Sequence, residues 1–335
     1  MSSWPSLALP VTPPLPPMEA RLEPELPRGR WLYEPKWDGF RCLAYRDGDQ
    51  LALQSKAGHP LERYFPEVVA ALRGLPARRF VLDGELTVET SFDDLLQRIH
   101  PAASRVRRLS RETPAVLRVF DLLVDERGRS LAEQPLERRR RGLERFAGRF
   151  FSETPGIVLS PTTDDSRQAR RWLSGQRGVD GVMAKDPDLP YRSGERTGMV
   201  KVKLLRTADC VVGGFRYAAK GKELGSLLLG LYDAAGTLDH VGFAASFEAS
   251  RRPALLAAVL PLRGGEGFTG RAPGGPSRWA SERSGEWEPL EPKLVVEVRY
   301  DHVTNGRFRH GTKLLRWRPD KDPRQCTFDQ LEDKK

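Results

Sequence analysis

Cysteine is scarce in this chain of 335 residues. Its three cysteines, Cys42, Cys210 and Cys326, are odd in number and lie far apart in the sequence. This spacing supplies neither a disulfide framework nor a cysteine zinc site, which points to a reducing compartment. The five histidines show no metal-ligand spacing either, so we expect them to be structural or on the surface.

Long apolar stretches are also missing. No run approaches the ~20 residues that a membrane-spanning helix requires. The proline-rich segment 1–17 lacks the basic-then-apolar pattern of a secretory signal. We therefore expect a cytoplasmic protein without membrane contact. Residues 1–20 should form an extended lead-in, either draped on the body or loose.

Charge, by contrast, is plentiful. Charged residues make up 30% of the chain, the formal net charge is +10 and the pI is about 9.7. Such a balance favours a polyanionic partner, with nucleic acid as the leading candidate. A merely basic protein is the alternative, because an excess of arginine over lysine can reflect genome composition.

Alternating apolar and polar residues predict short strands after the lead-in, and Asp47-Gly48 predicts a hairpin turn between two of them. These strands span 31–36, 41–46 and 51–55. Helical spacing follows over 61–73, where Pro66 opens the main run, and over 131–149. The second helix contains four consecutive arginines, 138–141, which we interpret as a solvated helix face.

After about residue 205 the pattern changes to short strands interrupted by one helix, 252–262. The strands are expected at 209–217, 226–232, 239–247 and 294–302. Short strands with a single helix are typical of a small β-barrel of OB type. We therefore divide the chain into the lead-in 1–20, a first domain 21–204 and a second domain 205–335.

A candidate nucleophile lies in the stretch from Glu34 to Arg41. A lysine attacks only as a neutral amine, so Lys36 needs partial desolvation or neighbouring positive charge. An apolar collar that includes Trp31, Tyr33 and Trp37 could desolvate it. The alternative is an exposed lysine before an Asp-Gly turn, which is common.

Further polar groups lie at or within predicted strands elsewhere in the chain. Glu85 follows a buried strand, and Phe120 interrupts another, where it either stacks on a base or belongs to the core. Lys201 and Lys203 share one face of a strand, because side chains alternate with period two. A phosphate between them is the natural partner, although an exposed edge strand also carries lysines.

Together these segments resemble the collinear motifs of the covalent nucleotidyltransferases, specifically the ATP-dependent DNA ligases. The segments are Lys36-Trp37-Asp38-Gly39, Ser55-Lys56, Asp83-Gly84-Glu85, Phe120-Asp121-Leu122, 180–185, 201–203 and Arg318-Pro319-Asp320-Lys321. They cover nearly the whole chain. The compact build, with segments 191–196 and 316–320, is most similar to the bacterial DNA ligase C group.

The resemblance implies an α+β architecture in two domains. An adenylation domain of antiparallel sheets with flanking helices would precede a C-terminal OB-fold barrel. The implied activity is the sealing of nicks in duplex DNA, in DNA repair, through a lysine–AMP intermediate. The implied cofactors are ATP and Mg²⁺ or Mn²⁺. The implied partner is nicked duplex DNA, and the enzyme would work as a bacterial cytoplasmic monomer, together with other repair proteins.

The resemblance also implies a role for each candidate residue. Lys36 would accept AMP from ATP. Glu34 would meet the adenine edge while Phe120 stacks on the adenine. Arg41 and Glu85 would hold the ribose and the phosphate side.

The remaining roles concern charge. Lys201 and Lys203 would neutralise the α-phosphate, and Asp180 with Glu85 would hold the divalent metal. Lys185 belongs to the nucleotide-binding set. Residues of the second domain would orient the pyrophosphate leaving group: Arg318, Asp320 and Lys321. A hinge is expected near 203–208, because the second domain must close for the first step and then reorient.

Two departures from the family pattern stand out. The family usually has arginine where this chain has Lys56, which keeps a point charge but loses a bidentate contact. It usually has glutamate where this chain has Asp180, whose shorter side chain suits a contact through water. Neither change removes charge, so we expect an active enzyme.

Four rival functions compete with ATP-dependent DNA ligation. An RNA ligase or an mRNA-capping guanylyltransferase shares the lysine chemistry, and capping would require GTP. An NAD-dependent ligase is disfavoured because the four-cysteine zinc module is missing. A non-catalytic OB-type nucleic-acid-binding protein would leave Lys36, Glu85 and Lys201 without a joint explanation.

Overall fold

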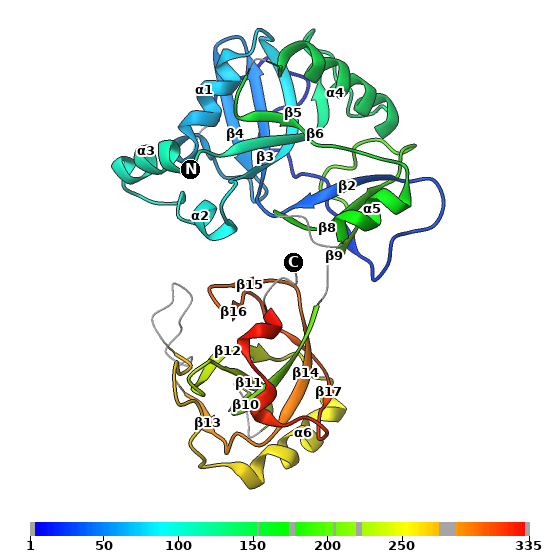
Figure 1. The fold of residues 1–335 in the computed structure, drawn as a ribbon. Coiled ribbons are helices and arrows are strands. Elements are labelled where there is room, and N and C mark those ends of the chain that lie inside the picture. The colour runs from blue at the N-terminus through cyan, green and yellow to red at the C-terminus, as the bar shows by residue number, and fades with distance from the viewer. Residues whose placement is uncertain are drawn as a thin grey trace. The chain divides into compact units, whose positions relative to one another are not determined.

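The computed structural model describes residues 4–152, 154–173, 178–203, 206–218, 223–274 and 286–331. The chain divides into two compact units, Met1–Leu204 and Leu205–Lys335 (Figure 1). None of the described helices is long and apolar enough to cross a membrane.

The larger sheet of the first unit has five strands in the order β4-β3-β5-β6-β7 (Figure 1). All neighbours are antiparallel except the parallel pair β6–β7. The strands are β3 (Phe40–Asp47), β4 (Gln50–Ser55), β5 (Arg79–Thr87), β6 (Val116–Val124) and β7 (Ile157–Leu159). The predicted turn at Asp47-Gly48 joins β3 to β4, which confirms the hairpin.

Both faces of this sheet are buried. Alternation along β3 sends Cys42 and Ala44 to a core that includes residues of α1 and α4, and sends Leu43 and Tyr45 to a second core on the other face. These strands carry apolar residues on both faces, and their buried acids, Asp83 on β5 and Asp121 on β6, are paired with arginines.

Four helices accompany the larger sheet. Pro66 occupies the first turn of α1, as predicted, where its missing N–H costs nothing. The basic segment 105–108, for which no helix was predicted, lies within α3. The helices are α1 (Pro66–Gly74), α2 (Phe92–Leu96), α3 (Ala103–Glu112) and α4 (Leu136–Phe150).

The arginine run in α4 is only partly solvated, so that interpretation is wrong for two of its four residues. Arg139 is 2% exposed and Arg140 6%. Arg139 donates two hydrogen bonds of 2.9 Å to the carboxylate of Asp121 on β6. The helical period turns these positions inward beside Leu143, and the buried carboxylate makes the burial of a charge tolerable.

The smaller sheet of the first unit has the order β1-β9-β8-β2. Its strands are β1 (Arg21–Leu22), β2 (Leu32–Trp37), β8 (Val179–Lys185) and β9 (Met199–Lys203). Helix α5 (Ser166–Leu173) packs on one face through Ala169 and Trp172. The chain crosses from this sheet to the larger one at Gly39, where a Cβ would collide with the backbone of Leu86.

The lead-in packs against the first unit. Leu9 and Met18 are buried in the core that contains Tyr45. The backbone of Glu19 donates to Glu195 over 2.8 Å, and β1 then continues as a parallel neighbour of β9. Of the two predicted alternatives, the draped one is confirmed for the described residues of this segment.

The second unit contains a six-stranded sheet in the order β12-β11-β10-β14-β17, with β13 (Glu288–Pro289) paired to β10, and α6 (Arg252–Val259) follows β12. A parallel bridge joins Ala244 of β12 to Thr312, the residue before β17, where Thr312 donates to Phe243 over 2.9 Å. This is the partly open barrel of an OB fold, as predicted. The strands are β10 (Arg206–Tyr217), β11 (Leu224–Tyr232), β12 (Leu238–Ala244), β14 (Val295–Tyr300) and β17 (Lys313–Trp317).

Candidate active site

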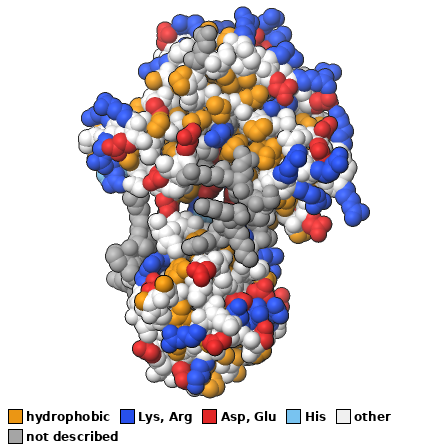
Figure 2. Space-filling model, in the orientation of Figure 1, with side chains coloured by type: hydrophobic (Ala, Val, Ile, Leu, Met, Phe, Trp, Pro, Cys, Tyr) orange, Lys and Arg blue, Asp and Glu red, His pale blue; other side chains and the backbone are white. Residues whose placement is uncertain are grey.

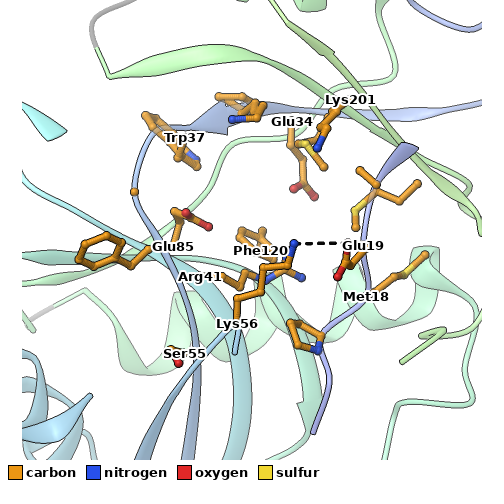
Figure 3. A pocket seen from close by; sticks show the side chains of 18 of the residues that line it. Met18, Glu19, Glu34, Trp37, Arg41, Ser55, Lys56, Glu85, Phe120 and Lys201 are labelled. Carbon is orange, nitrogen blue, oxygen red and sulfur yellow. Dashed lines mark ion pairs between the residues drawn. The ribbon is translucent and has the colours of Figure 1, made fainter. Parts of the chain in front are cut away.

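A cavity of about 530 Å³ opens in the first unit, which is large enough for a nucleotide. Both sheets line it. Figure 3 shows Glu34 and Lys201 of the smaller sheet facing Glu85 and Phe120 of the larger one, with Met18 at a further side. The predicted site residues that line it are Glu34, Lys36, Arg41, Lys56, Glu85, Phe120, Lys185 and Lys201.

Lys36 lies at the end of β2, and its side chain is 20% exposed. Its Nζ is 2.5 Å from Oδ2 of Asp180, at the start of the neighbouring strand β8. The predicted apolar collar is only partly correct. Trp37 lines the cavity, but Trp31 and Tyr33 pack in the core under α5. Lys36 is therefore held chiefly by a carboxylate.

A second ion pair is buried beside the cavity. Nζ of Lys185 lies 2.8 Å from the carboxylate of Glu34, and the two side chains are 7% and 4% exposed. The same Nζ lies 4.3 Å from the ring centroid of Phe120, and the guanidinium of Arg41 lies 4.7 Å from it. Two cations thus fix the orientation of this ring.

Arg41 is oriented by a chain of buried hydrogen bonds. Its guanidinium donates two bonds, of 2.5 and 2.6 Å, to Asp83, which is fully buried. The hydroxyl of Tyr191 donates to the same carboxylate over 2.6 Å and accepts from the backbone of Met18 over 3.1 Å. Neither Asp83 nor Tyr191 had a predicted role, although both belong to segments that carried the resemblance.

Among the described carboxyl groups of the cavity wall, Glu85 has the most strongly shifted pKa. Burial raises its pKa to about 7, because the loss of hydration outweighs the nearby charges of Arg41 and Lys36. Burial also lowers the pKa of Lys201, and the charges of Lys36 and Lys203 add to that shift. A bound anion such as a phosphate would stabilise the charged forms of these partly desolvated amines.

Lys56 lines the cavity at an exposed position, whereas Lys203 is not among the described residues that line it. Lys56 is 61% exposed, and its Nζ is 3.3 Å from the carboxylate of Glu19 (Figure 3). Lys203 is half-buried on β9, two residues beyond Lys201 and on the same face of that strand, but does not line the cavity. Sequence reasoning missed Glu19, because it assigned the lead-in no part in the site.

The predicted residues of the second unit cluster around Asp209 on β10. Arg318 donates bonds of 2.8 and 2.9 Å to that carboxylate and also binds Asp320. Nζ of Lys321 lies 3.9 Å from Asp209. The structure thus brings these three residues together, around an acid that sequence reasoning missed.

Comparison with known families settles the class of protein. Residues 19–203 match the family described as ATP dependent DNA ligase domain, and residues 220–321 match the ATP dependent DNA ligase C terminal region. The chain belongs to the ATP-dependent DNA ligases. The collinear segments identified in the sequence therefore lie in a ligase, as the resemblance implied.

Individual relatives of this ligase agree in length. It is 45% identical to DNA ligase C1 of Mycolicibacterium smegmatis, over 97% of this chain and 95% of that protein. It is 43% identical to DNA ligase C of Mycobacterium tuberculosis, over 97% and 96%. A solved Lig E DNA ligase shares the fold with a TM-score of 0.56 at 18% identity, over 90% of this chain and 98% of that one.

Proposed function

We propose that this ligase seals nicks in duplex DNA by carrying AMP on Nζ of Lys36. Membership of the ATP-dependent DNA ligases supplies the reaction class. The observation that carries the site is the position of Lys36 in the wall of a nucleotide-sized cavity, with Glu85, Phe120 and Lys201 in the same wall.

The proposed reaction has three balanced steps. Neutral Nζ of Lys36 attacks the α-phosphorus of ATP, so a P–N bond forms and the bond to pyrophosphate breaks. An oxygen of the 5′-phosphate at a nick then takes the AMP and frees the lysine. Finally the 3′-hydroxyl attacks the activated 5′-phosphate and releases AMP. Each step depends on alignment and on the neutralisation of phosphate oxygens.

Within this scheme different side chains of the cavity wall contact different parts of the nucleotide. Phe120 stacks on the adenine and Glu34 faces its edge, while Arg41 holds the ribose. Lys201 reaches the α-phosphate. The support is that these side chains converge on one cavity and that burial and neighbouring amines already lower the pKa of Lys201. The predicted set also contains Lys56, Lys185 and Lys203.

The donor set fits a divalent metal that the substrate helps to bind. Among the described residues, histidine, cysteine and acidic side chains form no group of three or more that could hold an ion. Mg²⁺ commonly uses one or two carboxylates together with substrate phosphates and water. Glu85, whose burial raises its pKa to about 7, and Asp180 are the carboxylates that would hold it. A bound Mg²⁺ or Mn²⁺ would neutralise phosphate oxygens during transfer.

In the proposed cycle the second unit closes over the cavity for the first step and then moves away from it. Arg318, Asp320 and Lys321 would orient the pyrophosphate in the first step, after which the unit reorients toward DNA. The expected hinge spans 203–208, of which residues 204 and 205 lie outside the described residues. Protection of this segment from limited proteolysis when ATP is added would support the motion.

Nicked duplex DNA is the proposed partner, held mainly through its backbone. The net charge of +10 and the lysine and arginine side chains on the visible faces of both units support this (Figure 2). We propose that the enzyme acts in repair as a monomer in the bacterial cytoplasm, together with other repair proteins.

Transfer of label from α-labelled ATP to the protein tests the site directly. The wild type should become labelled in the presence of metal, and Lys36→Ala should lose all detectable label while its thermal unfolding stays unchanged. Lys293→Ala, whose lysine is 64% exposed in the second unit and paired with Glu291, is the matched control and should keep the label. Label on Lys36→Ala would reject the assignment, and label from GTP instead of ATP would favour a capping enzyme.

A further inference from the structure

A short hairpin in the second unit lies directly on strand β12. Its strands are β15 (Val303–Thr304) and β16 (Arg307–Phe308), joined through Asn305 and Gly306, whose φ angles are 49° and 69°. Asn-Gly with both φ values positive is the tightest hairpin connection. Phe308 is buried, and a Cβ on Gly242 would lie 3.0 Å from its ring. The hairpin is therefore pinned to β12 at that point.

The pinned hairpin places Arg307 against a histidine. Nη2 of Arg307 lies 3.1 Å from Nδ1 of His240 on β12, and His240 is 4% exposed. Burial and the charges of Arg307, Arg216 and Arg271 lower the pKa of His240 to about 3. The imidazole is thus neutral at neutral pH. Nδ1 accepts from the guanidinium, which leaves the proton on Nε2.

A neutral acceptor makes Arg307 unlike other arginines of the same unit. Arg263, Arg316 and Arg318 are each paired with a carboxylate, of Glu288, Glu297 and Asp209 respectively. Among the described residues, Arg307 forms no ion pair with an acid. Histidine fixes the direction of the guanidinium without cancelling its charge.

A second arginine, Arg271, lies beside the pair and has an acidic partner of its own. The backbone of His240 donates to the carbonyl of Arg271 over 2.8 Å, which places residue 271 beside the pair. Burial and the charge of Arg271 lower the pKa of Arg307. Arg271 is itself exposed, with its guanidinium 3.7 Å from Asp239. Burial and a neighbouring arginine thus disfavour the charged form of Arg307. A phosphate bound to its guanidinium would stabilise that charged form.

We propose that Arg307, oriented by His240 and flanked by Arg271, binds a phosphate of the DNA backbone. The inference rests on the proposed function, in which DNA is the substrate. A further observation supports it. In OB folds the second and third strands and the connection between the fourth and fifth carry nucleic acid, and β12 and this hairpin occupy such places. His240 is a positioning residue in this proposal.

Binding of a nicked duplex oligonucleotide at several salt concentrations tests the proposal. Arg307→Gln should weaken binding roughly tenfold and lower the slope of log K against log salt by about 1. Arg263→Gln removes the same formal charge from the same unit, but from an arginine already neutralised by Glu288. That control should stay within about twofold of the wild type, with an unchanged slope.

Two further measurements keep the outcomes separate. Arg307→Lys keeps the charge and should keep the salt slope while it loses part of the affinity, a pattern that misfolding would not produce. Labelling with ATP alone should be the same for the wild type and all three variants. Wild-type affinity and slope in Arg307→Gln would overturn this inference while the proposed function stands. A wild-type protein that neither takes label nor seals nicks would instead reject the proposed function.

Discussion

The two units of this ligase use charged residues in opposite ways. In the first unit the pairs beside the cavity are buried, as with Glu34 and Lys185 at 4% and 7% exposure. In the second unit the predicted leaving-group residues span a wider range, with Arg318 at 18%, Lys321 at 28% and Asp320 at 63% exposure. Buried ion pairs fix the positions of their side chains before substrate binds. Exposed charged side chains stay mobile and interact with substrate only once they are brought next to it.

This contrast implies a division of labour. A nucleotide that entered the cavity of the first unit would meet side chains whose positions are already fixed. Arg41, for example, is held by two hydrogen bonds to Asp83. In the proposed cycle the second unit contributes groups that work at more than one place, so deep burial would hinder them. We therefore expect substitutions in the first unit to reduce both stability and activity, and those in the second to reduce mainly activity.

The largest expected effect tests the buried side of the comparison. Asp83→Asn leaves Arg41 buried without its counter-charge, which should lower the free energy of unfolding of the first unit by about 3–5 kcal/mol. The matched change in the second unit is Asp209→Asn, where Arg318 keeps Asp320 as a partner. It should cost less than about 2 kcal/mol. Equal losses in denaturant titrations would break the comparison.

The next effect concerns the pH dependence of stability. The ordinary pKa of Glu85 is 4.5 and burial raises it to about 7, so between these values the folded protein keeps a proton that the unfolded chain loses. Stability therefore falls as pH rises through this window. Relative to Glu85→Gln, the wild type should lose on the order of 2–3 kcal/mol between pH 4.5 and pH 7. Parallel stability curves for the two proteins would argue against burial as the cause.

A smaller effect is expected from the second unit. Arg318→Gln should slow lysine adenylation roughly ten- to hundredfold, because it removes a charged contact to the leaving group, while unfolding changes by less than about 1 kcal/mol. Arg316→Gln is the control, since Arg316 is exposed and paired with Glu297. Its adenylation rate should stay within about twofold of the wild type. A loss of stability as large as that of Asp83→Asn would contradict the division of labour.

The smallest effect tests how the lead-in is attached. Tyr191→Phe removes the hydroxyl between Met18 and Asp83, which should cost about 1–2 kcal/mol and speed amide hydrogen exchange at Met18. Tyr33→Phe removes a hydroxyl that binds only the carbonyl of Pro27, so exchange at Met18 should not change. Similar exchange in both variants would show that Tyr191 does not secure the segment.

Local patterns predicted the parts of the fold that local chemistry decides. The Asp47-Gly48 turn, Pro66 at the start of α1 and the strand 41–46 were all predicted from neighbouring residues. The candidate site was predicted through collinear motifs, each of which contributes residues from a different segment of the chain. The structure then places Lys36 and Lys201 in one cavity.

Long-range pairing explains what could not be predicted. Arg139 can be buried because its guanidinium pairs with Asp121 on β6. The sequence of α4 alone cannot show that partner. Tyr191 and Asp83 are 108 positions apart, yet share a hydrogen bond. Trp31 and Tyr33 were taken for a collar around Lys36, but their strand turns them toward α5.

The attachment of the lead-in has a consequence for how the chain folds during synthesis. Its first part contacts residues made soon afterwards, such as Ala8 with Asp47 and Leu15 with Gln54. Its last part contacts residues made far later: Met18 with Tyr191, Glu19 with Glu195, and Arg21 with Val200. As the chain leaves the ribosome, residues 18–22 must wait until about 170 more have emerged before these partners exist. This wall of the cavity is thus completed last, and a nascent chain halted before residue 191 should not retain nucleotide.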